Sequence, residues 1–335
     1  MTEKPPYTIT PEIVSRIEQI GEAIGRAEVS GASQDLHLRR INRIRTIRGS
    51  LAIEGNTLSE DQVATLFDGK LVIAPPREIL EARNAIKAYD RYEQWDPASE
   101  SDLLEAHGVL LEGLMDNPGH YRRSTVVVAG AAGIHHVGPP PERVPGLMSD
   151  LLGWLDVTEE HPLIAGSVFH YEFEFIHPFE DGNGRMGRLW QTLVLTRWKS
   201  LFARIPVESL VHARQQEYYQ AIRHSTLQGK GNPFIEFMLK IILEAVRVHE
   251  AGDQESDQVS DQVAKLLAAL RKGPRAAADL MAELGLVHRP SFRKRYLHPA
   301  ISMGLVEMTR PESPTARDQK YRLTPKGRGV RGVGA

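Results

Sequence analysis

The 335-residue sequence contains no cysteine, which excludes disulfide bonds, thiol nucleophiles and cysteine-ligated zinc, and which favours a cytoplasmic location. It also lacks any apolar run approaching the roughly 18 residues that a membrane-spanning helix needs, so no membrane contact is expected. The N-terminus has no apolar stretch typical of a secretory signal. With 41% apolar and 25% charged residues, the composition is that of a soluble globular protein.

The net charge is −2, but the charges are distributed unevenly. Residues 271–335 contain fourteen Lys and Arg against five Asp and Glu, so the preceding residues carry a net negative charge. A basic segment attached to an acidic body indicates a polyanion as a partner of that segment. At this length, two or three domains are expected.

Helical signals dominate the first 250 residues. Thr10, Pro11 and Glu12 form a helix start, and apolar residues then recur at helical spacing. Further helices are expected around 35–50, 59–68, 76–94, 100–115, 145–156 and 160–175, and a strand over residues 124–128. We divide this part into an N-terminal helical region, 1–100, and a core, 101–250.

The remaining residues are expected to form a separate unit. Residues 251–258 are polar and lack periodicity, which indicates a linker. Residues 259–327 then predict three helices, the last over 290–303, and two strands near 304–308 and 321–323. Three helices followed by a two-stranded wing are typical of a winged helix-turn-helix domain. The tail, residues 328–335, is expected to be disordered.

Residues 177–188 contain an anion-binding pattern. Gly182, Asn183 and Gly184 stand where a loop enters a helix, and backbone N–H groups at such a junction form a nest that the helix dipole reinforces. Arg185 and Arg188 are three residues apart, so both project near the helix start and can pair with phosphate oxygens. The pattern predicts a nucleotide-phosphate site.

The same loop contains a base and a metal ligand. His177 is the group in the loop that can accept a proton near neutral pH. Asp181 offers hard oxygen ligands suited to a Mg²⁺ ion that bridges phosphates. Positioning, charge neutralisation and a base are what phosphoryl-type transfer requires of a protein.

The string from His177 to Arg188 resembles the signature of Fic-domain proteins, HxFx(D/E)GNGRxxR, and matches it at every fixed position. The resemblance implies a mainly α fold, the Fic helical fold with a β-hairpin flap, plus the C-terminal winged helix-turn-helix domain of many bacterial members. It makes residues 101–250 the catalytic core. Most characterised members transfer AMP from ATP to a hydroxyl side chain of a target protein.

The resemblance also assigns roles. His177 would deprotonate the target Ser, Thr or Tyr hydroxyl, Phe179 would anchor the loop, and Asp181 would hold Mg²⁺ between the α- and β-phosphates. The expected ATP-binding positions of the signature are Asp181, Gly182, Asn183, Gly184, Arg185, Met186, Gly187 and Arg188, the last pairing with the γ-phosphate. Gly184 is intact where kinase-type relatives carry Lys, which disfavours phosphorylation.

Two further segments resemble family elements. A flap is expected over 124–137, with Ser124, Thr125, Val126 and Val127 nearest the nucleotide, and it would bind the target protein by strand addition. An ordinary hairpin is the alternative. Tyr218, the first of a Tyr pair, resembles the adenine-side tyrosine. Core packing explains it equally well, and Thr226 replaces an Asn that binds nucleotide in some relatives.

Residues 50–56 resemble the inhibitory motif of the family, (S/T)xxxE(G/N), through Ser50, Glu54 and Gly55. A Glu at the end of a helix gains from a cationic partner. In the family that Glu reaches the second arginine of the signature, here Arg188, at the nucleotide. The resemblance therefore implies auto-inhibition, and the alternative is a solvated surface Glu.

The expected third helix of the C-terminal unit carries four cations, Arg289, Arg293, Lys294 and Arg295. Such a helix can lie in the major groove of DNA, or it can serve protein or dimer docking. A DNA-binding regulator with a nucleotide-sensing Fic-like body is the alternative function, although an intact His177 and Asp181 argue against it. A homodimer is expected from relatives. The other histidines show no zinc-site spacing, and His107 is expected in the core.

Overall fold

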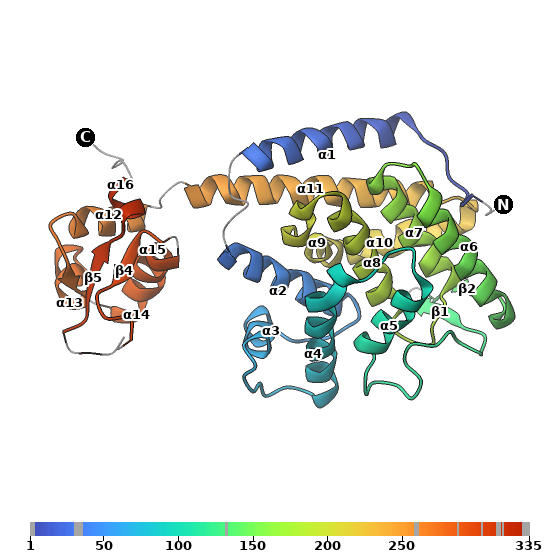
Figure 1. Cartoon of the computed structure of the whole chain (residues 1–335), viewed down its shortest axis with the longest axis horizontal. Coiled ribbons are helices and arrows are strands. Elements are labelled where there is room, and N and C mark those ends of the chain that lie inside the picture. The colour runs from blue at the N-terminus through green and yellow to red at the C-terminus, as the bar shows by residue number, and fades with distance from the viewer. Residues whose placement is uncertain are drawn as a thin grey trace. The chain divides into compact units, whose positions relative to one another are not determined.

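The structure is a computed structural model that describes residues 4–29, 36–130, 133–257, 261–286, 288–302, 304–312, 316 and 318–329. The chain divides into two units, Met1–Glu250 and Ala251–Ala335 (Figure 1). The first unit is mainly helical, as predicted. None of the helices in these ranges is long and apolar enough to cross a membrane.

The first unit contains eleven α-helices in its described residues, with one hairpin inserted after the fifth. The helices are α1 (Pro11–Val29), α2 (Leu36–Ile53), α3 (Glu60–Phe67), α4 (Pro76–Arg91), α5 (Glu100–Leu110), α6 (Val144–Val157), α7 (Pro162–Ile176), α8 (Asn183–Trp198), α9 (Val207–Ala213), α10 (Gln215–Gln228) and α11 (Asn232–Asp257). The helix predicted over 100–115 ends earlier, at Leu110, where a series of turns begins.

Helices α7 and α8 form the centre of this unit. Most residues of α7 are buried on all sides of the helix, which identifies it as a fully enclosed helix rather than an amphipathic surface one. Phe169, Phe173 and Trp190 are among the fully buried side chains that α7 and α8 contribute. The loop between the two helices, residues 177–182, is therefore held at both ends by the core.

Two long helices far apart in the sequence, α1 and α11, lie side by side (Figure 1). Arg26 pairs with Glu250 at 2.7 Å, and the Thr10 hydroxyl donates to Glu236 at 3.0 Å. Helix α11 continues to Asp257, so the segment for which a linker was predicted is helical as far as that residue, and Gln258 lies outside the described residues.

The hairpin consists of β1 (Val127–Gly130) and β2 (Gly133–Val137), which pair antiparallel with a bulge between Val128 and Ala129. The strand predicted over 124–128 was placed too early. The Ser124 carbonyl accepts a hydrogen bond from the Arg122 guanidinium at 2.8 Å, so this residue is held by a side chain rather than by a neighbouring strand. The hairpin tip, residues 131–132, lies outside the described residues.

The second unit has its own core and a small sheet. Its elements are α12 (Asp261–Leu270), β3 (Arg275–Ala276), α13 (Ala277–Glu283), α14 (Arg289–Phe292), a π-helical turn (Arg293–Leu297), α15 (His298–Ser302), β4 (Val306–Met308), β5 (Lys320–Leu323) and α16 (Pro325–Gly329). The antiparallel sheet has the order β3-β5-β4. Leu266, Phe292 and Tyr321 lie in its core.

The helices and both wing strands of this unit occur near their predicted positions. Strand β3 and helix α16 were not predicted, and α16 includes the first residues of the segment expected to be disordered. Residues 330–335 of that segment lie outside the described residues.

Candidate active site

His177 ends α7 in an unusual backbone conformation. Its φ of 50° makes it the one non-glycine residue with positive φ in the described ranges. Its N–H donates to the Phe173 carbonyl at 2.9 Å, which closes the helix, and its buried Nδ1 has no hydrogen-bond partner among the residues that the structure describes. A left-handed backbone costs a residue with a Cβ about 1–2 kcal/mol, so the surrounding contacts must hold it.

Arg122 provides many of these contacts, although no local sequence pattern identifies it as a site residue. The buried guanidinium donates Nε to the His177 carbonyl at 2.7 Å and Nη2 to the Ile176 carbonyl at 3.3 Å. It also donates to the Ser124 carbonyl at 2.8 Å and to the Pro139 carbonyl at 2.6 Å. Arg122 thus ties both stems of the hairpin to the end of α7. Burial lowers its pKa, but an Arg guanidinium remains charged.

A stacked pair fixes the middle of the loop. The Phe179 ring is fully buried and lies parallel to His107, with centroids 3.7 Å apart. His107 Nδ1 accepts from the Gly119 N–H at 2.8 Å, so its Nε2 carries the proton and donates to the Asp181 carbonyl at 3.0 Å. Burial lowers the pKa of His107 to about 4, which keeps the ring neutral. His107 is a core residue, as predicted, and also a support of the loop.

The Asn183 side chain folds back onto the loop. Its Oδ1 accepts from the Phe179 N–H and its Nδ2 donates to the Phe179 carbonyl, both at 2.9 Å. The amide group is therefore engaged, and what Asn183 offers a phosphate is its backbone N–H. Together with those of Gly184 and Arg185, this N–H belongs to the first turn of α8 and has no acceptor within the helix.

We expect Asn183→Ala to lower the free energy of unfolding by about 1–3 kcal/mol, because it leaves two buried backbone groups of Phe179 without partners. Denaturant unfolding monitored by circular dichroism measures this loss. Unchanged stability together with lost nucleotide binding would instead identify the side chain as a phosphate ligand.

Two glycines allow the close approaches at the start of α8. Gly182 has φ of 82°, and a Cβ there would lie 2.6 Å from Leu111 Cδ2. A Cβ at Gly184 would lie 2.4 Å from Glu54 Oε1 and 2.9 Å from Arg188 Nη1. The absence of a side chain at Gly184 therefore lets the Glu54 carboxylate reach the helix start.

Glu54 and Arg188 form an ion pair although 134 residues separate them. Arg188 Nη2 lies 2.7 Å from Glu54 Oε1, and the same guanidinium donates to the Ser50 hydroxyl and to the Ser50 carbonyl, each at 3.1 Å. The Arg188 side chain is 2% exposed and that of Glu54 is 36% exposed. Burial opposes the charge of Arg188, but the Glu54 carboxylate together with Tyr218 and Glu174 outweighs it, and the net pKa of Arg188 is raised.

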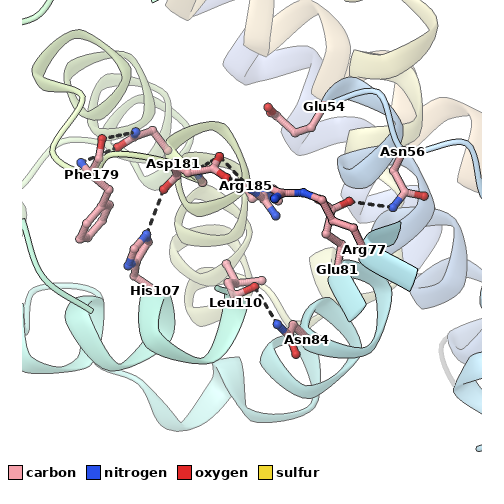
Figure 2. A network of polar contacts seen from close by, with 12 residues as sticks. Glu54, Asn56, Arg77, Glu81, Asn84, His107, Leu110, Phe179, Asp181 and Arg185 are labelled. Atoms are coloured by element: carbon pink, nitrogen blue, oxygen red, sulfur yellow. Dashed lines mark hydrogen bonds and ion pairs between the residues drawn. The ribbon is translucent and has the colours of Figure 1, made fainter. Parts of the chain in front are cut away.

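The Asp181 carboxylate contacts two arginines, Arg185 and Arg77 (Figure 2). Its Oδ1 accepts from the Gly182 N–H at 2.6 Å and from Arg185 Nη2 at 3.1 Å. Its Oδ2 accepts from Arg77 Nη2 at 3.3 Å. Arg185 is buried, and its Nε has no partner in the described residues. Arg77, on α4, was not among the residues singled out from the sequence.

The donor set around Asp181 fits Mg²⁺ rather than a metal held wholly by protein. In the residues that the structure describes, no three His, Cys, Asp or Glu side chains gather to hold a metal. Mg²⁺ is usually bound by one or two carboxylates together with waters and substrate phosphates. A half-exposed carboxylate beside an anion-binding helix start meets that description.

Three of the sequence-predicted residues, Met186, Gly187 and Tyr218, lie in the protein interior. Met186 is fully buried, and the Cα of Gly187 faces the His170 ring. Tyr218 is buried, with its hydroxyl 3.1 Å from His170 Nε2 and 3.5 Å from Glu174 Oε1, and burial raises its pKa well above the usual value. Ser124 and Thr125 are exposed at the base of the hairpin.

The model of the Fic/DOC family matches residues 97–195, which include the loop, and the model of the Fic-like C-terminal domain matches residues 261–324. A Fic family protein of solved structure from Desulfovibrio desulfuricans G20 is 51% identical and has a TM-score of 0.74, with 98% of this chain and 100% of that chain covered. The chain belongs to the Fic family.

More distant Fic relatives match a smaller part of the chain. A protein adenylyltransferase Fic of Culex quinquefasciatus is 30% identical over 221 residues, which are 61% of this chain and 41% of the relative. Fic-1 of Caenorhabditis elegans (residues 134–508) has a TM-score of 0.58 at 23% identity, with 72% and 74% of the two chains covered, so it supports the Fic fold alone. The chain spans less than half the length of the curated relatives that it matches.

Proposed function

We propose that this Fic protein is an auto-inhibited protein adenylyltransferase, which transfers AMP from ATP to a Ser, Thr or Tyr hydroxyl of a target protein and of itself. The observation that carries the proposal is one loop that presents a base, His177, beside the guanidinium of Arg185 and the first-turn N–H groups of α8, which have no acceptor within the helix. The curated relatives named as adenylyltransferases support the same chemistry.

In the proposed reaction, a ring nitrogen of His177 accepts the proton of the target hydroxyl. The hydroxyl oxygen attacks the α-phosphorus, the bond from that phosphorus to the oxygen bridging to the β-phosphate breaks, and pyrophosphate leaves. The first-turn N–H groups of α8 and the guanidinium of Arg185 stabilise the phosphate charge, and Arg188 would bind the γ-phosphate. Mg²⁺ held by Asp181 would neutralise phosphate charge when bound.

The hairpin is proposed to bind the target. Val127 and Val137 face each other across β1 and β2, and they are 53% and 54% exposed. A short two-stranded ribbon with exposed valines next to the base suits the addition of an extended target segment. Arg122 would fix the position of this hairpin relative to His177.

The ion pair between Glu54 and Arg188 is proposed to inhibit the enzyme. The carboxylate lies against Gly184 and on the guanidinium that the γ-phosphate requires, so the two anions compete for one position. ATP that binds without this contact would hold its α-phosphate away from His177. The N-terminal region, residues 1–100, would then be regulatory.

The decisive experiment supplies ATP labelled either at the α-phosphate or at the γ-phosphate, with Mg²⁺, to the chain and to its Glu54→Gly variant. AMP transfer leaves the α-label on protein and none of the γ-label. Transfer of the γ-label would identify a kinase, and no covalent label in either protein would favour a nucleotide-sensing regulator.

A second function, DNA binding, is favoured by the charges of the C-terminal unit. Arg289, Arg293 and Arg295 are exposed and have no acidic partner in the part of the unit that the structure describes. Four cations elsewhere in the unit are paired with acidic residues, for example Arg322 with Glu307 at 2.7 Å. Unpaired arginines on one helical segment suit the phosphates of duplex DNA, and we propose a winged helix-turn-helix role for this unit.

We expect the full chain to bind duplex DNA with an affinity that falls steeply with salt. The double variant Arg289→Ala/Arg293→Ala should reduce the slope of log K against log salt by about two, because each lost phosphate contact removes about 0.9. Fluorescence anisotropy measures the slope, and Arg322→Ala, which removes a cation already paired, is the control. An equal loss in both variants would contradict the assignment.

A further inference from the structure

The two oxygens of the Asp181 carboxylate have different partners. Oδ1 accepts from the Gly182 N–H and from Arg185, both part of the loop itself. Oδ2 accepts nothing from the loop in the described residues, and its partner is Arg77 of α4, 104 positions away. Oδ2 is therefore the oxygen on which a divalent cation would bind, and Arg77 occupies that direction.

A second carboxylate, that of Glu81, orients the Arg77 side chain toward Asp181. Glu81, one helical turn further along α4, accepts from Arg77 Nε at 3.3 Å. The other oxygen of Glu81 accepts from Asn56 Nδ2 at 2.9 Å. Asn56 is buried and also donates to the Glu78 carbonyl at 3.2 Å, so this side chain braces its own segment against α4.

These contacts form one continuous chain from Asn56 through Glu81 and Arg77 to Asp181 (Figure 2). Asn56 stands two residues after Glu54, whose carboxylate holds Arg188. The segment 54–56 is thus joined to both charged partners of a nucleotide, namely the arginine for the γ-phosphate and the carboxylate for the metal.

We infer that Arg77 is a positioning residue that competes with the divalent cation for Oδ2 of Asp181, and that Glu81 and Asn56 hold Arg77 in this position. This inference rests on the proposed function. Its guanidinium lowers the metal affinity of Asp181 both by occupying an oxygen and by charge repulsion. The inhibitory segment therefore acts on the metal ligand as well as on Arg188.

The test is binding of Mn²⁺ in the presence of ADP, with free Mn²⁺ measured by electron paramagnetic resonance on the full chain. ADP is used because it has no γ-phosphate and so does not require Arg188. Arg77→Ala should tighten Mn²⁺ binding roughly three- to ten-fold, since an ion pair 61% exposed at its arginine is weak but the repulsion of a divalent ion is added to it. Glu81→Gln and Asn56→Ala should shift binding the same way by less.

Arg83→Ala is the matched control, because Arg83 lies on the same helix, carries the same charge and is exposed. It should leave Mn²⁺ binding unchanged, and Asp181→Ala should abolish it. Unchanged or weaker binding in Arg77→Ala overturns the inference, and weaker binding would make Arg77 a phosphate ligand instead. Failure of every variant to bind Mn²⁺ overturns it as well. Tighter Mn²⁺ binding in Arg77→Ala alone would support the competition between Arg77 and the metal. It would overturn the role of Glu81 and Asn56, and with it the link to segment 54–56.

None of these measurements requires turnover. A chain that shows the Mn²⁺ shifts but transfers no AMP would refute the proposed function and leave the competition between Arg77 and metal intact. A chain that transfers AMP but shows no Mn²⁺ shift would support the proposed function and refute the competition between Arg77 and metal.

Discussion

Glu54→Gly is expected to label itself with AMP roughly ten- to hundred-fold faster than the unaltered chain. Hydrogen bonds to charged groups contribute about 1.5–3 kcal/mol, and each 1.4 kcal/mol corresponds to a factor of ten. Loss of the contact between Glu54 and Arg188 therefore favours binding of the γ-phosphate to Arg188 by about ten- to hundred-fold. The carboxylate that lies against Gly184 is then absent, and the γ-phosphate can bind Arg188. Incorporation of α-labelled ATP over time measures the rate.

Glu54→Gln separates charge from size at this position. The amide fills nearly the same volume but carries no charge, so we expect a rate between those of the unaltered chain and of Glu54→Gly. Ser50→Ala removes one acceptor from Arg188 and should have a smaller effect in the same direction. Equal rates for all four proteins would show that the ion pair does not inhibit transfer.

Removal of the base is expected to have the opposite effect. In the Glu54→Gly background, His177→Ala should lower the transfer rate by about 10²–10⁴, the usual contribution of a positioned general base. Nucleotide binding, measured by calorimetry, should change little, because the phosphates are bound by α8 and its arginines.

The conformation of His177 calls for a second variant. Alanine in a left-handed backbone adds strain, whereas asparagine tolerates that region and cannot accept a proton at neutral pH. His177→Asn should therefore be as inactive as His177→Ala, but its folded state should be more stable than that of His177→Ala. His224→Ala, which removes an exposed histidine from α10, should transfer AMP normally. Full activity in His177→Asn would exclude this residue as the base.

The sequence predicted those parts of the site that depend on short-range order. The proposed base, the proposed metal ligand and both arginines stand within twelve residues, and the glycines mark where α8 begins, so their proximity follows from the chain itself. The pairing of Glu54 with Arg188 was predicted through resemblance to the family, because no local pattern joins residues 134 positions apart.

The missed residues share a physical cause. Arg122 binds four backbone carbonyls, and carbonyl positions depend on the folded chain rather than on side-chain identity. From the sequence, Arg77 is expected to be an ordinary exposed cation at the start of a helix. Its contact with Asp181 depends on how α4 packs against the rest of the fold. The signature predicted Asn183 as a phosphate ligand, but it did not predict the two hydrogen bonds between the Asn183 amide and the backbone of Phe179.

The buried guanidinium of Arg188 also links activity to folding stability. With Glu54 in place its charge is compensated, and without a partner a buried cation destabilises the native state. In the proposed mechanism, release of Glu54 therefore produces a less stable protein, and the γ-phosphate that replaces the carboxylate stabilises the fold again by mass action. The resting enzyme would be the more stable species, and ATP would stabilise the fold of the released enzyme as well as serve as its substrate.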